Sequence, residues 1–159
     1  MTSRKSSKWR GRIIRYAPLV LWIGVIFFLS SAFASLSGTS RFIRPILVFL
    51  FPEATAETFL LYHGFIRKFA HFAEYAILAF FAARAFYNSS VEALRKFCFS
   101  ASIILVLVVA AFDEINQAFI PARTGSAGDV LIDAAGGLAM TAFLVFFRRP
   151  SGQYKSFDA

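Results

Sequence analysis

Side chains that could carry out acid–base chemistry or hold an anion lie within or beside apolar stretches between residues 67 and 133. A histidine beside carboxylates can act as a general acid or base, and an arginine can hold a phosphate. Ionisable groups inside a membrane segment are costly, and by default they indicate a functional site. The predicted catalytic residues are His71, Glu74, Asp113 and Glu114, and the predicted ligand-binding residues are Arg67, Lys68, Gln117, Arg123, Asp129 and Asp133.

Many of these residues recur at the spacing of an α-helix, in which positions three or four apart share one face. Asp113 and Glu114 are adjacent, so they point about 100° apart on an ideal helix. Only one of them can face the axis of a helix bundle, and we expect the other to pair with a neighbour. The sets with helical spacing are Arg67, His71 and Glu74; Asp113 and Gln117; Glu114 and Gln117; and Asp129 and Asp133.

Four apolar segments must position these side chains. They cover residues 17–36, 69–87, 97–119 and 128–147, each long enough to cross a bilayer. Backbone polar groups in lipid must be satisfied internally, so helices are predicted. The predicted fold is an all-α, integral membrane four-helix bundle over 17–147, between basic tails at 1–16 and 148–159. In the first outer loop, residues 53–62 are predicted to form a short helix at the membrane interface, followed by a solvated His63.

The composition also requires a membrane protein. Of the 159 residues, 58% are hydrophobic and 16% are charged, against about 45–50% and about 25% in soluble domains. Such values exclude a disordered or water-soluble chain. The net charge of +8 would suggest a nucleic-acid partner in a soluble protein, but the basic residues flank apolar segments, so no nucleic-acid partner is predicted. The single cysteine excludes an intramolecular disulfide.

The distribution of lysine and arginine predicts the orientation. With the N-terminus inside, the cytoplasmic segments hold twelve basic residues and the outer segments hold five. Both termini are therefore predicted to be cytoplasmic, and polar residues from three helices then meet at the outer end of the bundle. An alternative is a cleaved signal peptide, because Ala32-Phe33-Ala34 follows a basic start and an apolar run.

Two interpretations of the polar residues stay open. One is an outward-facing pocket that binds or processes a ligand, which leaves open whether the protein is an enzyme. The other is a buried ion-pair network in a non-catalytic structural or scaffold subunit, since buried charges must be paired. The imidazole and carboxylates could also bind a divalent cation. However, His71 and Glu74 reverse the Glu-x-x-His order of di-iron bundles, so no metal ligand is predicted and no cofactor is specified.

Taken in order, the polar blocks resemble the VanZ-like family. The blocks are Arg67-Lys68-x-x-His71-Phe72-x-Glu74-Tyr75, Asp113-Glu114-x-x-Gln117, Arg123-x-Gly125 and Asp129-Val130-x-x-Asp133. The match extends from about residue 65 to about residue 145. The resemblance implies a small, multi-pass protein of the bacterial cytoplasmic (inner) membrane, in the context of the cell envelope. The family takes its name from a protein linked to teicoplanin resistance, so a link to glycopeptide resistance is also implied.

The residues and the resemblance together predict a function at the cell envelope. We expect an outward-facing polar pocket that binds or processes an envelope lipid or a glycopeptide-related ligand. The expected partners are the lipid bilayer and either a lipid-linked envelope precursor or a phospholipid headgroup.

Overall fold

The computed structural model describes residues 2–31, 45–119 and 127–147. The described residues contain no strand, and 45–50 are helical in addition to the labelled helices. This confirms the all-helical prediction. Four helices are long and apolar enough to cross a membrane. The labelled helices are α1 (Thr2–Ser30), α3 (Ala56–Tyr87), α4 (Glu92–Lys96), α5 (Cys98–Ala118) and α6 (Ala127–Phe147).

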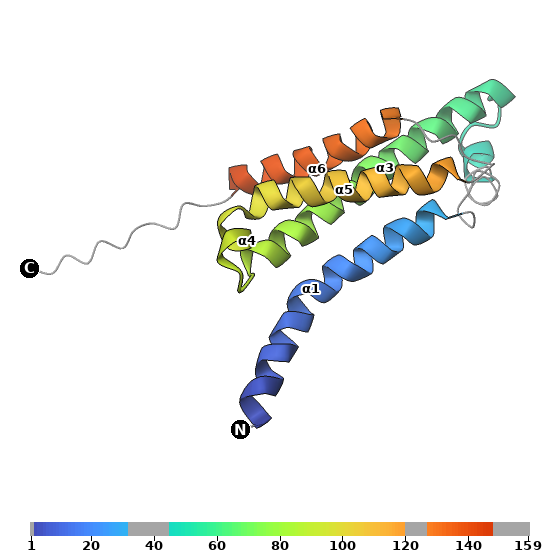
Figure 1. The fold of residues 1–159 in the computed structure, drawn as a ribbon. Coiled ribbons are helices and arrows are strands. Elements are labelled where there is room, and N and C mark those ends of the chain that lie inside the picture. The colour runs from blue at the N-terminus through green and yellow to red at the C-terminus, as the bar shows by residue number, and fades with distance from the viewer. Residues whose placement is uncertain (1, 32–44, 120–126, 148–159) are drawn as a thin grey trace, which may run out of the picture.

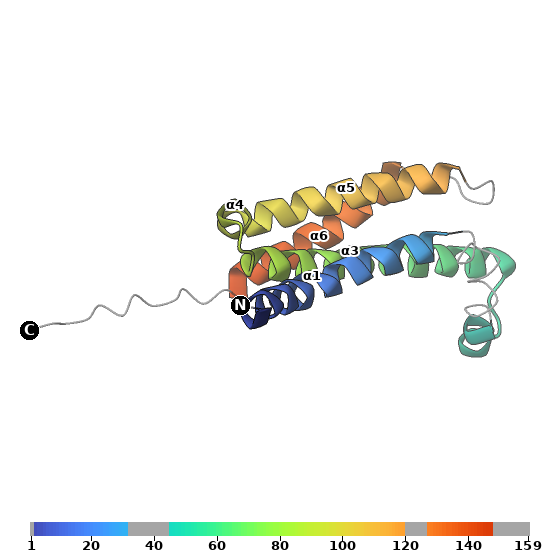
Figure 2. The same cartoon turned by 60° about the horizontal axis from the view of Figure 1, so that its bottom comes forward.

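The central helix of the bundle is α3. It packs against α1, α5 and α6, and its most extensive interface is with α6. Figure 1 shows the short α4 joining α3 to α5 at one end of the bundle. At the opposite end, where α5 terminates and α6 begins, the first turns of α3 extend beyond the other helices (Figure 2). We call this opposite end the polar end.

Two of the predicted apolar segments differ in their bounds from the helices that contain them, because hydropathy locates the apolar part of a helix and not its ends. The first helix is Thr2–Ser30, whereas the predicted segment is 17–36, of which 32–36 lie outside the described residues. The helix begins earlier because arginine and lysine are good helix formers. Residues 56–62 are not a separate interfacial helix but the start of α3, which has no proline to interrupt it. By contrast, the predicted 97–119 and 128–147 segments agree with α5 and α6 to within one residue at each end.

Local signals explain how α1 and α3 are shaped. Pro18 lies inside α1, where it has no N–H to donate and its ring crowds the carbonyl of the preceding turn. Figure 1 shows α1 bending in this part of its length, as expected for a proline in a helix. At the start of α3, the side chain of Thr55 accepts a hydrogen bond of 3.3 Å from the backbone N–H of Thr58. This cap satisfies one of the free donors of the first turn.

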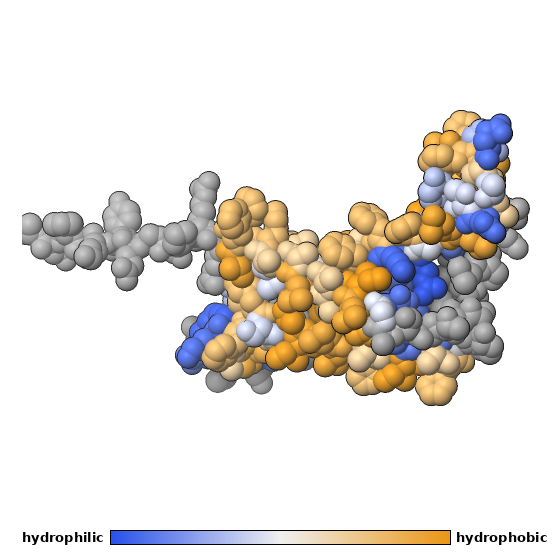
Figure 3. Space-filling model, turned by 90° about the horizontal axis from the view of Figure 1, so that it is seen from above, coloured by the Kyte–Doolittle hydropathy of each residue, from blue (hydrophilic) through white to orange (hydrophobic). Residues whose placement is uncertain are grey.

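Small side chains build the interior between the helices. Ala79, Ala82 and Ala85 of α3 and Ala110 of α5 are fully buried. Small residues let helix backbones approach closely, which is how helices associate in lipid. Large apolar side chains cover the outside instead, and Figure 3 shows a surface that is hydrophobic along most of its length. A protein with this arrangement exposes its apolar side chains to lipid.

Hydrogen bonds help to hold α1 against the bundle. The hydroxyl groups of Tyr16 and Ser89 lie 2.9 Å apart, at the end of α3 that leads to α4. Nearer the polar end, Nε1 of Trp22 donates a hydrogen bond of 2.9 Å to the backbone carbonyl of Glu74. The contact joins α1 to α3 at Glu74, about one turn from His71.

Replacing Trp22 by phenylalanine should remove this indole donor and keep an aromatic side chain. We expect the free energy of unfolding to fall by about 0.5–1.5 kcal/mol, the net value of one such hydrogen bond. The matched control is Trp9→Phe, because Trp9 lies on the same helix and is 66% exposed. Both variants would be unfolded with SDS in detergent micelles. Equal stability of the two variants would contradict a role for the indole hydrogen bond.

Candidate functional site

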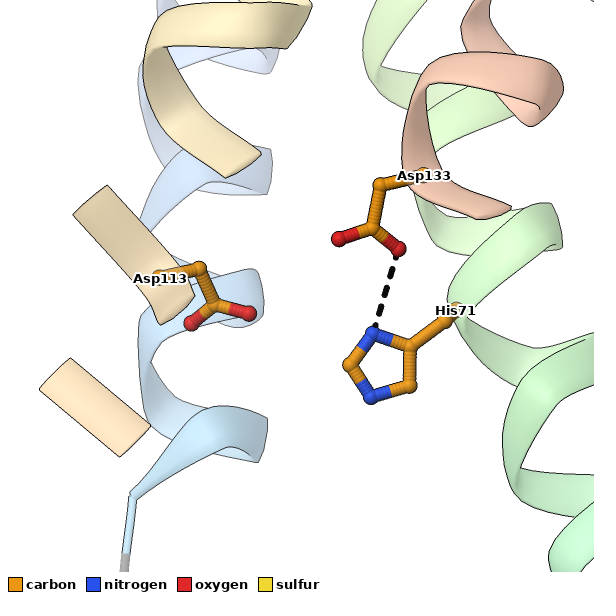
Figure 4. Close-up of side chains that lie close together, drawn as sticks. All are labelled: His71, Asp113 and Asp133. Carbon is orange, nitrogen blue, oxygen red and sulfur yellow. Dashed lines mark ion pairs between the residues drawn. The ribbon is translucent and has the colours of Figure 1, made fainter. Parts of the chain in front are cut away.

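Three side chains from three helices meet inside the bundle near its polar end. His71 of α3, Asp113 of α5 and Asp133 of α6 each place a potential ligand atom within 4.8 Å of the other two. Figure 4 shows the imidazole and the two carboxylates directed toward a common space. Their exposed fractions are 8%, 1% and 2%. We call these three residues the buried cluster.

A close approach of α3 and α6 brings two members of the cluster together. A Cβ atom on Gly136 would overlap the backbone carbonyl of Phe72, so a residue with no side chain is needed at this point. Phe72 follows His71, and Gly136 lies about one turn after Asp133. As a result, Nδ1 of His71 and Oδ1 of Asp133 are 3.3 Å apart. This is an ion-pair distance, although neither atom makes a hydrogen bond within the described part of the chain.

Asp113, and not Glu114, faces the interior. Oδ2 of Asp113 accepts a hydrogen bond of 2.9 Å from Nε2 of Gln117, one turn further along α5. The same Nε2 lies 3.5 Å from Oγ of Ser30, at the end of α1. Glu114 is only half-buried and is not one of the three cluster residues. The difference agrees with the helical spacing, by which adjacent residues cannot share a face.

A second polar feature lies one helical turn above the cluster. Nη2 of Arg67 donates a hydrogen bond of 2.7 Å to Oδ2 of Asp129. Arg67 precedes His71 by four residues on α3, and Asp129 precedes Asp133 by four on α6. The two pairs therefore lie one turn apart between α3 and α6. We call the Arg67–Asp129 pair the upper rung and the His71–Asp133 pair the lower rung. The upper rung joins the middle of α3 to the first turn of α6.

The upper rung borders a cavity of about 250 Å³, which we call the Arg67 cavity. The Arg67 side chain is 28% exposed, and Lys68 is exposed beside it, so both can present positive charge to a ligand. Figure 3 shows a hydrophilic patch near the end of the molecule at which α6 begins. The lining residues are Leu60, His63, Gly64, Arg67, Lys68 and Asp129.

The structure thus divides the predicted site residues into groups. Glu74 and Glu114 are half-buried and belong neither to the cluster nor to the cavity lining. Arg123 lies outside the described residues, as does the tripeptide at 32–34. The remaining predicted residues are Arg67, Lys68 and Asp129 at the cavity, His71, Asp113 and Asp133 in the cluster, and Gln117 bonded to Asp113.

Sequence reasoning missed two polar residues on α3. His63, predicted to be solvated, is only 9% exposed and lines the Arg67 cavity. Tyr75 is fully buried. The signal that could have found them is spacing, because His63, Arg67, His71 and Tyr75 follow one another at intervals of four. A helix assumed to begin at residue 69 hides this stripe, whereas a helix beginning at Ala56 displays it.

The two parts of the site differ in the chemistry they can support. The Arg67 cavity offers guanidinium and ammonium donors, which recognise phosphate and carboxylate groups. The buried cluster offers one imidazole and two carboxylates, which can exchange protons or bind a cation. Because the cluster is at most 8% exposed, only a small species can reach it without displacing side chains.

Four apolar helices around a set of ionisable side chains define a small multi-pass membrane protein with a polar site inside its bundle. The family model described as VanZ/LLP1 matches residues 16–148. The chain therefore belongs to the VanZ/LLP1 family, which confirms the resemblance found in the polar blocks. No curated protein and no solved structure matches the chain.

Proposed function

We propose that this protein lies in the bacterial cytoplasmic membrane with its polar end outward, and that it binds the anionic headgroup of an envelope lipid in the Arg67 cavity. The orientation is supported by the twelve basic residues on the opposite side, against five on this one. The ligand class is a phosphate-bearing lipid, either a phospholipid or a lipid-linked envelope precursor. The observation that carries the proposal is the pair of neighbouring basic side chains, Arg67 and Lys68, at a cavity between membrane helices.

Arg67 has donors to spare for such a headgroup. A guanidinium carries five N–H donors, and among the described residues only Nη2 has an acceptor, the carboxylate of Asp129. That contact holds one end of the guanidinium while other N–H groups stay available. Arginine held in this way can bind a phosphate through two parallel hydrogen bonds. Lys68 would add a second, more mobile positive charge.

The surroundings of the cavity suit a ligand with an apolar tail. Leu60, Phe65 and Phe69 of α3 are 75%, 63% and 72% exposed. They lie on the same stretch of helix as the two basic residues, so an acyl or polyprenyl chain could rest against α3 while its headgroup occupies the cavity. A lipid would gain apolar contacts with these side chains, whereas a soluble anion would not.

The geometry supports binding more directly than processing. The rung formed by Arg67 and Asp129 lies one turn above His71, which is 8% exposed. A reacting bond held at the upper rung would be a helical turn, about 5.4 Å, away from that imidazole. The proposed roles of His71 and Asp113 as catalytic residues therefore require the ligand to move past the upper rung.

The test of binding compares Arg67→Gln with Arg84→Gln on the same helix. Arg84 is exposed in the last turn of α3, far from the cavity. The full chain, purified in mild detergent, would be titrated with phosphatidylglycerol and with a polyprenyl phosphate, and bound lipid counted by native mass spectrometry. We expect Arg67→Gln to weaken binding about 10–100-fold, from about 1.5–3 kcal/mol for a charge-assisted hydrogen bond. Arg84→Gln should bind as the wild type does.

The two lipids distinguish the possible sources of the headgroup. Selective loss of polyprenyl phosphate would identify a lipid-linked precursor, and equal loss of both lipids would identify general recognition of phosphate. Unchanged binding in folded Arg67→Gln would contradict the proposal. A link to glycopeptide (teicoplanin) resistance is proposed from the family alone, and its test is growth in teicoplanin of cells that produce the wild type or Arg67→Gln.

A second candidate function is structural. Cross-helix polar contacts favour it, because Arg67 and Asp129 join α3 to α6, while Gln117 and Ser30 join α5 to α1. In that case the protein would be a scaffold or subunit, and the polar residues would only hold the bundle in register. Arg67→Gln would then lower thermal stability and leave lipid retention in the folded fraction unchanged.

A further inference from the structure

The geometry points to a divalent cation site in the buried cluster, with an imidazole nitrogen of His71 and one carboxylate oxygen each from Asp113 and Asp133 as ligands. This inference does not depend on the proposed lipid ligand, because the cluster and the Arg67 cavity share no residue. The three ligand atoms come from α3, α5 and α6 and lie within 4.8 Å of one another. Figure 4 shows them directed toward a common space.

The distance between two of the ligand atoms already fits a metal site. Zinc bonds to nitrogen and oxygen of about 2.0–2.2 Å place neighbouring ligands of a tetrahedral site about 3.3–3.6 Å apart. Nδ1 of His71 and Oδ1 of Asp133 are 3.3 Å apart, and apart from this contact neither atom has a partner among the described residues. A cation bound by both atoms would accept one lone pair from the imidazole nitrogen and one from the carboxylate oxygen. The Asp113 ligand atom lies within 4.8 Å of the other two, so a small movement of its side chain would complete three ligands.

Independent of the cluster geometry, buried oxygen atoms nearby lack well-formed hydrogen bonds. Asp113 and Gln117 are each 1% exposed, and they bond to each other through Oδ2 and Nε2. The remaining atoms, Oδ1 of Asp113 and Oε1 of Gln117, accept no well-formed hydrogen bond from a described residue, although the buried hydroxyl of Tyr75 lies close enough to interact with Asp113. Buried acceptors in this state are costly and require an explanation such as a bound ion. A metal bound to Asp113 would satisfy the first of them.

Charge balance favours the same conclusion. Asp113 and Asp133 put two negative charges within a few ångströms of each other, 1% and 2% exposed, between membrane helices. The nearest rung above them uses Arg67 for Asp129, and among the described residues no lysine or arginine forms an ion pair with the two cluster carboxylates. A divalent cation with a neutral imidazole would bring the sum of charges to zero, which lowers the cost of burying the two carboxylates.

The ligand set also restricts the metal. Calcium and magnesium prefer shells made of oxygen, whereas an imidazole nitrogen together with carboxylates suits zinc and its neighbours in the first transition series. The H-x-x-E order in the sequence argues against a metal only if Glu74 is the partner of His71. The structure pairs His71 with Asp133 of another helix instead. Two residues on different helices can meet at any separation in the sequence, so no motif predicts this pair.

The test uses the full chain, purified in detergent through a tag without histidines and stripped of metal with a chelator. Zinc would be titrated in competition with a chromophoric chelator. We expect one zinc ion per wild-type chain. Since second-shell partners of a metal contribute about 10–100-fold in affinity, loss of a ligand should cost at least about 100-fold. The variants are Asp113→Asn and Asp133→Asn.

Matched controls separate this site from general affinity for acidic or imidazole groups. Asp129→Asn lies on the same helix as Asp133, and His63→Asn lies on the same helix as His71. Both should bind zinc as the wild type does. Equal zinc affinity of wild type and Asp133→Asn would overturn the inference, and so would an equal loss in Asp129→Asn.

A measurement on the wild type alone decides the matter if the cluster variants do not fold. Zinc should raise the melting temperature of the stripped chain, and magnesium at the same concentration should not. Cobalt bound in place of zinc should show the visible d–d bands of nitrogen and oxygen coordination. Absence of both the stabilisation and the bands would overturn the inference.

Discussion

Gly136→Ala is expected to destabilise the bundle more than alanine at any other described glycine, by about 3 kcal/mol or more in the free energy of unfolding. The added Cβ would overlap the backbone carbonyl of Phe72. A clash with a flexible side chain can relax through a rotamer change, but this one can relax only if α3 and α6 separate. Their interface is the most extensive in the bundle, so separation disturbs every contact between them. SDS-induced unfolding in detergent micelles would measure the loss.

Gly64→Ala is the matched control for that substitution. Gly64 also lies inside a membrane helix, and a Cβ there would meet nothing within 4 Å. Alanine is a better helix former than glycine by about 0.8–1.0 kcal/mol, so this variant should be as stable as the wild type or more so. A stable Gly136→Ala variant would show that α3 and α6 do not approach as closely as the contact with Phe72 requires.

Tyr75→Ala is expected to lower the free energy of unfolding by about 2–4 kcal/mol. Tyr75 is fully buried and is the largest of the fully buried side chains in the described residues. Truncating it leaves a cavity whose lining loses its dispersion contacts. We place the value somewhat below the range of about 3–5 kcal/mol for aromatic residues in soluble cores, because moving an apolar group between lipid and a helix bundle is nearly neutral.

Phe69→Ala serves as its control. Phe69 lies on the same helix and is 72% exposed, so its loss should change the free energy of unfolding by no more than about 0.5 kcal/mol, as for surface positions generally. Tyr75→Phe separates the ring from the hydroxyl group, because it keeps nearly all of the volume. Equal losses in Tyr75→Ala and Phe69→Ala would mean that α3 does not turn Tyr75 into the interior.

Much of the fold can be predicted from the sequence because lipid leaves few choices. An uncharged run such as Phe97 to Phe112 must form a helix in a bilayer, and α5 and α6 were predicted to within a residue at each end. An apolar run does not, however, predict where a helix ends once the helix leaves the bilayer. Arg10 and Arg12 lie well inside α1, and Leu60 and Leu61 lie inside α3, because helical hydrogen bonds continue in water as long as no residue interrupts them.

The site could be predicted only one helix at a time. Spacing along α3 put Arg67 and His71 on one face, and spacing along α6 did the same for Asp129 and Asp133. Which residue of one helix meets which of the other depends on the closest point between their axes. The run of small residues at 134–137 predicts a close approach of another helix to α6, and Gly136 makes it through its contact with Phe72, but no pattern within a single helix reveals which residue of α3 it meets.

The length of α3 has a consequence for when the Arg67 cavity can be reached. Its 32 residues span about 48 Å at about 1.5 Å per residue, whereas the hydrocarbon core of a bilayer is about 30 Å thick. With Tyr87 at one edge of the core, the other edge falls near Arg67 and Lys68. A thicker bilayer would draw these two residues among the acyl chains, and a thinner one would leave them among the headgroups. The acyl-chain length of the surrounding lipids would then regulate access to the Arg67 cavity without any change in the protein.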